Sequence, residues 1–185
     1  MKDYTVRRYS FSDLTGEARE RAIKGMQNSL YESMDERELT QFLKEIVGDE
    51  LGSIPAAIEI AYSLSNCQGD GVALYGSINK AEAKTLDWPD RVESVSLIRN
   101  SWGNHYSHYY SFDVELFDGE GEEIELTDTI IETQLRDLCQ LLERKGYGAI
   151  DDEQSEESAI ARLRELDSDS FLESGAYSPP EGVLV

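Results

Sequence analysis

The period of the hydrophobic residues changes along the chain, and this change limits the possible folds more than any other feature. Between residues 15 and 47, apolar side chains recur every three to four positions, as on one face of an amphipathic helix. From residue 58 they alternate with polar residues, which is the pattern of a half-buried strand. Helical periodicity returns after residue 127. This order predicts an α+β fold in which helices pack on an antiparallel sheet.

The pattern predicts about four helices and about five strands. The helices are expected at about residues 15–30, 33–47, 128–145 and 155–166. The second opens with the capping-box pair Ser33 and Glu36, and Lys145-Gly146 is a typical helix end. The strands are expected at residues 5–9, 58–64, 72–78, 92–99 and 105–117, with a short continuation at 122–126.

The length of 185 residues favours one domain, although it could hold two small ones. We expect a single acidic α+β domain over residues 1–175. Residues 176–185, which include Pro179 and Pro180, are expected to form a flexible tail. Two cysteines, Cys67 and Cys139, do not make a disulfide framework in a chain of this size, so reduced thiols are expected.

The chain is strongly acidic, and its charge is unevenly distributed. It has 38 acidic and 17 basic residues, for a net charge of −21, and residues 101–185 alone carry −16. Phosphates and anionic membranes repel such a chain, so we expect direct binding neither to nucleic acid nor to a membrane. The sequence shows no apolar run of membrane-spanning length and no apolar signal-peptide core, which predicts a cytoplasmic protein.

A possible site lies in the connection between two expected strands, at Cys67, Gln68, Gly69, Asp70 and Gly71. Cys67 could serve as a nucleophile with His105 or His108 as the base, but neither histidine lies in the pattern of a known thiol enzyme. A phosphate cradle would need a helix directly after the loop. Glycines on both sides of an aspartate suit a tight connection with positive φ, so a hairpin turn is the favoured interpretation.

Patterns for metal binding and for acid–base catalysis are weak. His105 and His108 would point to opposite faces of a strand. The acidic runs at residues 118–123 and 151–153 lack the ligand spacing of an EF-hand loop. Paired carboxylates for glycoside chemistry would need a cleft and one raised pKa. We therefore expect no metal, no cofactor and no catalytic residue.

Acidic residues with few neighbouring bases dominate the last third of the chain. Carboxylates four residues apart on a helix lie roughly 5–6 Å from each other, so a row of them can approximate a phosphate backbone. A solvated face that keeps the protein soluble explains the same pattern more simply. The expected partner-binding surface consists of Glu120, Glu122, Glu123, Glu125, Asp128, Glu132, Asp137, Asp151, Asp152, Glu153, Glu156 and Glu157.

Three stretches together resemble a known group of proteins. They are residues 6–23, residues 62–72 with the sequence YSLSNCQGDGV, and residues 105–108 with the sequence HYSH. They are similar to an uncharacterised family of small phage and prophage proteins with a YSLSxxQGDGV hairpin, over about residues 5–145. The resemblance implies a phage genome and action in the cytoplasm of the host, and it carries over no catalytic residue.

The charge and the resemblance together favour a non-enzymatic inhibitor of a host defence system of the CRISPR–Cas or restriction type. Its partner would be a host nucleic-acid-binding protein or complex, which meets a surface that mimics DNA. One alternative is a nucleotide-type ligand-binding protein or enzyme that uses the hairpin and the tyrosines Tyr62, Tyr75, Tyr106, Tyr109 and Tyr110. Another is an interaction module of a phage assembly. The sequence leaves the oligomeric state open.

Overall fold

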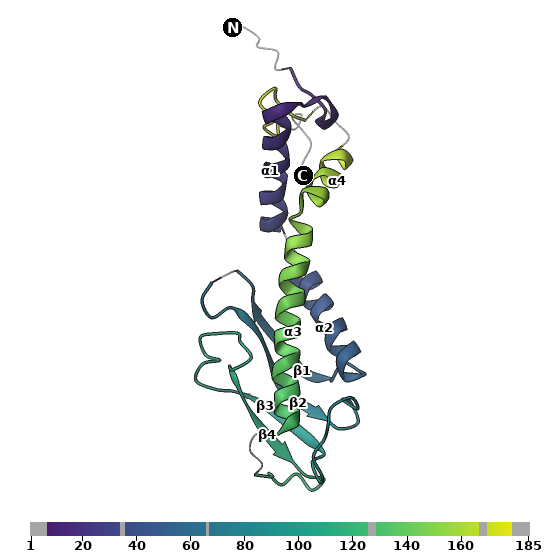
Figure 1. Ribbon diagram of the computed structural model, residues 1–185, viewed down its shortest axis with the longest axis vertical. Coiled ribbons are helices and arrows are strands. Elements are labelled where there is room, and N and C mark those ends of the chain that lie inside the picture. The colour runs from purple at the N-terminus through teal and green to yellow at the C-terminus, as the bar shows by residue number, and fades with distance from the viewer. Residues whose placement is uncertain (1–6, 34–35, 66, 126–128, 167–169, 179–185) are drawn as a thin grey trace. The chain divides into compact units, whose positions relative to one another are not determined.

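The computed structural model describes residues 7–33, 36–65, 67–125, 129–166 and 170–178 (Figure 1). It has an α+β fold, as predicted. The helices are α1 (Gly16–Ser33), α2 (Glu36–Leu51), α3 (Ile130–Glu153) and α4 (Glu156–Glu165), preceded by a 3-10 turn at Phe11–Asp13. The strands are β1 (Ala57–Ser63), β2 (Gly71–Asn79), β3 (Ser94–Arg99) and β4 (Phe112–Phe117). The described part of the chain therefore has a four-stranded sheet, one strand fewer than about five.

The chain divides into two compact units. The sheet unit comprises residues 35–148, and the terminal unit comprises residues 1–34 and 149–185. The single acidic α+β domain expected over residues 1–175 stays a prediction. Of the expected tail, residues 176–178 are described, and the Ser178 amide donates to the Ser170 carbonyl. Residues 179–185 lie outside the described part.

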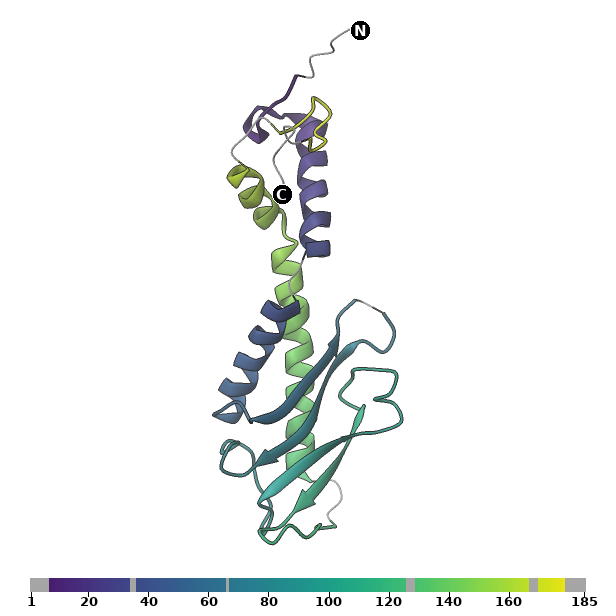
Figure 2. The same cartoon turned by 180° about the vertical axis from the view of Figure 1, so that it is seen from behind.

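The sheet is antiparallel throughout, in the order β1-β2-β3-β4. Helix α3 crosses one face of it, in front of the strands in Figure 1 and behind them in Figure 2. Tyr62 lies on the same face as Ile60 and its partner Leu74, and the Tyr62 hydroxyl donates to the Glu36 carbonyl of α2. Helix α2 therefore lies on the face of the sheet that carries Ile60 and Tyr62, and Gly146 of α3 lies next to Leu43 of α2.

Each unit has a core of its own. In the terminal unit, α1 and α4 pack around Leu30, Ala159, Leu163 and Phe171. The apolar faces of α2, α3 and the strands fill the sheet unit, where the largest fully buried side chains are Leu43, Val47, Leu51, Val72, Leu74, Ile78, Phe112, Ile131, Leu135 and Leu142. None of the described helices is long and apolar enough to span a membrane.

Gly76 allows the close pairing of the first two strands. It lies opposite Ile58 and has a φ of +110°, a conformation that side chains with a Cβ rarely adopt. A Cβ at this position would overlap the carbonyl oxygen of Ala57. The residue type at position 76 is therefore set by the backbone of β1.

The prediction of a long strand at residues 105–117 is wrong for residues 105–111. These residues form turns, because side chains hold the backbone in local hydrogen bonds. The Asn100 side-chain oxygen accepts from the amides of Trp102 and Gly103, at 3.0 and 3.2 Å. The Ser111 hydroxyl accepts from the His108 amide at 3.1 Å. The alternation of aromatic and polar residues at 105–111 is typical of a strand, although these residues form turns.

Some expected helix boundaries are also wrong. Helix α3 continues past Gly146 to Glu153. A glycine at position 146 is explained by packing, since a Cβ there would lie 2.5 Å from the Leu64 side chain. Ser33 is the last residue of α1 and does not open α2. Ser155 is the N-cap of α4 as predicted, and its hydroxyl accepts from the Ser158 amide.

The ends of three further expected elements fall outside the described residues. Asp128, at which the third helix is expected to begin, is among them, and the Thr129 hydroxyl accepts from the Glu132 amide. Residues 5, 6 and 126 also lie outside. The two expected short strands at residues 5–9 and 122–126 are represented in the described part by single bridges, Tyr9 with Phe171 and Glu123 with Phe117.

Candidate functional site

The hairpin loop between β1 and β2 is organised around the carboxylate of Asp70. The Ser63 hydroxyl donates to Oδ1 at 2.6 Å, and the amides of Cys67 and Ser65 donate to Oδ2 at 2.6 and 2.8 Å. Burial opposes ionisation, but these hydrogen bonds outweigh it and lower the pKa of Asp70 to about 2. Asp70 therefore remains ionised at neutral pH and fixes the shape of the loop.

A second loop, residues 100–111 between β3 and β4, packs against this hairpin. Gly69, at a φ of +90°, lies so close to the Tyr106 ring that a Cβ there would overlap it. A Cβ on Gly71 would lie 3.0 Å from the Ser107 carbonyl oxygen and 3.3 Å from the His108 ring. The fold thus brings together two stretches that carry the resemblance, residues 62–72 and 105–108.

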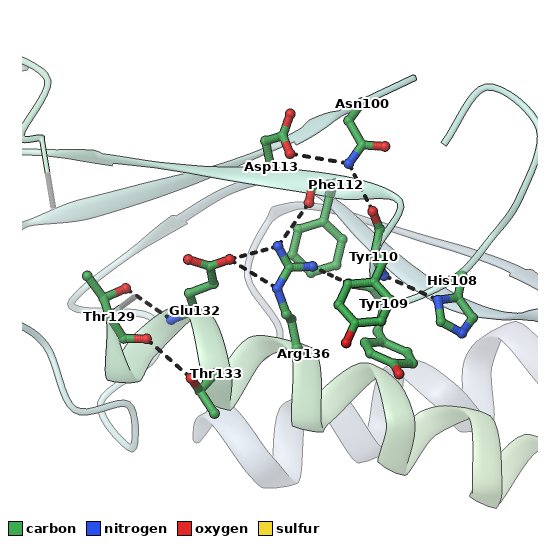
Figure 3. A network of polar contacts seen from close by, with 10 residues as sticks. All are labelled: Asn100, His108, Tyr109, Tyr110, Phe112, Asp113, Thr129, Glu132, Thr133 and Arg136. Carbon is green, nitrogen blue, oxygen red and sulfur yellow. Dashed lines mark hydrogen bonds and ion pairs between the residues drawn. The ribbon is translucent and has the colours of Figure 1, made fainter. Parts of the chain in front are cut away.

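Arg136 of α3 holds the second loop, residues 100–111, to the helix (Figure 3). Its guanidinium donates to the carbonyl oxygens of Tyr109 and Phe112 and pairs with Glu132 at 2.7 Å. The same group lies over the Phe112 ring at 4.9 Å. Because the Arg136 side chain is only 19% exposed, these interactions are largely shielded from solvent.

The second loop carries a group of exposed rings, which we call the aromatic surface: Trp102, His105, Tyr106 and Tyr110. The exposed fractions of Trp102, Tyr106 and Tyr110 are 65%, 40% and 59%. The Trp102 and His105 rings lie 6.1 and 6.3 Å from the Tyr106 ring. The signal in the sequence is that residues 101–111 contain no Asp, Glu, Lys or Arg, in a chain that is 30% charged.

The side chains considered for a thiol nucleophile and its base make other contacts. Cys67 is exposed, and its Sγ contacts the Ser65 carbonyl oxygen at 3.8 Å. His108 stacks with Tyr110, and its Nδ1 accepts from the Tyr110 amide. Cys139 is fully buried in α3, and burial raises the pKa of its thiol to about 12. Within the described ranges, no three His, Cys, Asp or Glu side chains are placed to share a metal ion.

The tyrosines considered for a ligand pocket differ in their exposure. Tyr75 is buried under the second loop, where its hydroxyl donates to the Ser111 carbonyl at 3.4 Å and burial raises its pKa. Tyr106 and Tyr110 are exposed on the outside of the loop. Two cavities, of about 580 Å³ between α1 and α4 and about 400 Å³ beside α3, are lined by other residues.

The expected acidic surface divides between the two units. We call Glu120, Glu122, Glu123, Glu125 and Asp137 the sheet-unit acidic group, and Asp151, Asp152, Glu153, Glu156 and Glu157 the terminal-unit acidic group; all are exposed. Glu132 is half-buried and pairs with Arg136, so it belongs to neither group. Asp128 lies outside the described residues.

The turn after β4 directs three glutamates into solvent. Asp118 Oδ1 accepts from the amides of Glu120 and Glu122, at 2.9 and 3.0 Å. Hydrogen bonds from Glu122 and then Glu120 lower the pKa of Asp118. In the terminal unit, Glu156 and Glu157 occupy the first turn of α4, where carboxylates interact favourably with the helix dipole.

These features define an α+β protein that exposes the sheet-unit acidic group, the terminal-unit acidic group and the aromatic surface. Comparison with the profiles of known protein families, with characterised protein sequences and with solved structures finds no match.

The Asp70→Asn substitution is expected to lower stability in a pH-dependent way. The folded-state pKa of Asp70 lies below its usual value, so the stabilisation is fully present above about pH 5 and is lost as the pH falls towards 2. At pH 7 the free energy of unfolding should decrease by about 1–2 kcal/mol, after discounting for solvent screening. Urea unfolding of both proteins between pH 2 and 7 measures the difference.

The exposed carboxylate of Asp151 provides the control for this measurement. The Asp151→Asn variant should follow the native protein within about 0.5 kcal/mol throughout. A stability loss by Asp70→Asn that stays constant down to pH 2 would contradict the role given to the Asp70 charge.

Proposed function

We propose that this protein is a non-enzymatic inhibitor that docks its exposed carboxylates on the basic nucleic-acid-binding surface of a host defence protein. The observation that carries the proposal is that, in the described part of the chain, no member of either acidic group forms an ion pair. Unneutralised carboxylates on an ordered turn and on helix ends are the charges that a phosphate-binding surface would accept.

The distribution of bases supports this proposal. After residue 100 the chain has five basic residues, and two of them are engaged close to their own position in sequence. Arg136 pairs with Glu132, and Arg162 pairs with Glu165 at 3.1 Å. The remaining excess of negative charge opposes folding through self-repulsion, so its retention is consistent with use in binding.

The resemblance to phage proteins favours a target in a host defence system of the CRISPR–Cas or restriction type, reached in the host cytoplasm. Such systems grip DNA or RNA through basic clefts. Association between an acidic and a basic surface is accelerated by their opposite charges and weakened by salt, because the Debye length is only about 8–10 Å at 0.1–0.15 M ionic strength. A salt-sensitive complex is therefore expected.

Reversing the charge of three residues of the sheet-unit acidic group should weaken binding to the host protein by about 10- to 100-fold, since these charges supply attraction across the interface. The variant is Glu120→Lys, Glu122→Lys and Glu123→Lys, and a second variant changes Glu156 and Glu157 to lysine in the terminal unit. Each tagged protein would be used to capture proteins from a bacterial lysate that contains active defence systems, with titration of the captured protein to measure affinity.

The matched control makes the same change in net charge on α2, by replacing the exposed Glu38, Glu45 and Glu50 with lysine. It should bind like the native protein. If the control loses as much affinity as the first variant, only the overall charge matters, and docking by the acidic groups is wrong. Equal capture by all variants would also exclude it.

A further inference from the structure

We propose that the aromatic surface is a second docking surface, which binds a segment of a protein partner that combines an arginine or lysine with apolar side chains. This inference goes beyond the proposed function, because it concerns a different surface. Exposed tryptophan and tyrosine side chains, together with arginine, are the residues that most often dominate the binding energy of protein interfaces.

The exposure of these rings is not a consequence of a loosely held loop. Tyr106 packs on Gly69, and the Asn100 side chain joins both ends of the loop by accepting from the Trp102 amide and donating to the Tyr110 carbonyl at 2.9 Å. Arg136 holds the Tyr109 carbonyl from the other side. A loop that is already ordered loses little conformational entropy when it binds, so its exposed rings are available for a contact.

Carboxylates border the aromatic surface, and they determine the sign of the partner's charge. The Asn100 side chain that donates to the Tyr110 carbonyl also donates to Asp113 at 3.2 Å, and Asp113 is exposed. Asp70 fixes the hairpin loop between β1 and β2, which packs against Tyr106, and the Glu143 carboxylate lies next to Gly71 of the same hairpin. This border favours a basic segment and repels an acidic one.

The two bases near the loop are occupied by partners within the chain. Arg99 lies over the Tyr75 ring at 4.0 Å, donates to the Gly103 carbonyl and pairs with Glu59. Arg136 is engaged with Glu132 and two carbonyls, and its guanidinium also lies over the Tyr110 ring at 5.5 Å. A cation from outside therefore meets ring faces and carboxylates, and both attract it.

A single-stranded nucleic acid is the competing occupant, because bases stack on exposed aromatic side chains. Such proteins combine the rings with a positively charged groove that follows the backbone. Here the loop has no basic residue of its own and its border is acidic. The charges therefore favour a basic protein segment over a nucleic acid.

The test is selection of a displayed library of random peptides against the full-length native protein. Enriched peptides should contain arginine or lysine beside apolar residues. A synthetic peptide of the selected sequence should bind the Trp102→Ala variant about 10- to 30-fold more weakly, as for a central aromatic contact. Trp102→Phe should recover part of this loss. Phe42→Ala, which removes a 37% exposed ring from α2, should bind like the native protein.

Several results would overturn the inference: no enrichment, enrichment of acidic peptides, equal binding by Trp102→Ala, or tight binding of oligothymidylate that Trp102→Ala abolishes. Circular dichroism confirms that each variant is folded. Failure here is distinguishable from failure of the proposed function. The selected peptide should bind the Glu120→Lys, Glu122→Lys and Glu123→Lys variant within about three-fold of the native protein, since that variant keeps the aromatic surface.

Discussion

Substituting Gly76→Ala is expected to lower the free energy of unfolding by about 3–5 kcal/mol. Alanine is strained at a φ of +110°, and its Cβ would overlap the Ala57 carbonyl oxygen, so β1 and β2 must separate or shift. Because β2 is central in the sheet, the damage reaches the core. Urea unfolding followed by far-ultraviolet circular dichroism measures the loss.

Gly148→Ala is the matched control for this substitution. Gly148 lies in α3 with open space around the position of a Cβ, so alanine should be neutral or should stabilise the helix by about 0.5–1 kcal/mol. If Gly76→Ala were as stable as Gly148→Ala, the close pairing of β1 and β2 at this position would be wrong.

The same measurement tests the single domain expected over residues 1–175. Both tryptophans, Trp88 and Trp102, lie in the sheet unit, so their fluorescence reports on that unit, whereas circular dichroism reports on the helices of both units. A single cooperative domain predicts that the two signals change at the same urea concentration, in the native protein and in Gly76→Ala. Separate transitions would show that the two units unfold independently.

The second large effect is expected at Arg136. Arg136→Ala should lower the free energy of unfolding by about 2–3 kcal/mol, because it leaves two carbonyls and the half-buried Glu132 without their donor. Arg136→Lys should recover only a small part, since an ammonium group cannot reproduce the fork of donors. Amide hydrogen exchange in residues 101–111 should accelerate in both variants, which shows that Arg136 holds the aromatic loop.

Arg162→Ala is the control for Arg136→Ala, because the Arg162 and Glu165 side chains of its ion pair are 61% and 66% exposed. The expected loss is below about 0.5 kcal/mol, as for surface ion pairs in general. Similar losses at the two arginines, or unchanged exchange in the loop of Arg136→Ala, would contradict the role assigned to the network in Figure 3.

The strand at residues 57–63 could be predicted because Ile58 and Ile60 are more buried than Glu59 between them. In the returning strand, residues 71–75 are all buried, so alternation in the sequence does not reflect exposure there. At residues 105–111 the same alternation misleads, since Asn100 and Ser111 stabilise turns that compete with a strand. Gly146 resembles a helix end in sequence, and its packing against Leu64 depends on a contact distant along the chain. Periodicity cannot detect either effect.

The candidate surfaces were predictable to different degrees. Exposed carboxylates in the last third of the chain follow directly from the charge pattern, but their division between two units does not. Gly69 and Gly71 on both sides of Asp70 predict the turn between β1 and β2. Its contact with residues 105–108 could not be derived from spacing, because it joins segments that are close only in the folded chain. The uncharged run at residues 101–111 was a visible signal for the aromatic surface.

Competition with DNA tests the central claim most directly. The captured host protein would be bound to a labelled DNA duplex and titrated with the native protein at several salt concentrations. The native protein should displace the duplex, and it should displace less of it at higher salt. The variant with Glu120→Lys, Glu122→Lys and Glu123→Lys should need a concentration about 10-fold or more higher for the same displacement. Simultaneous binding of the duplex and the native protein, or displacement that the charge reversal leaves unchanged, would contradict it.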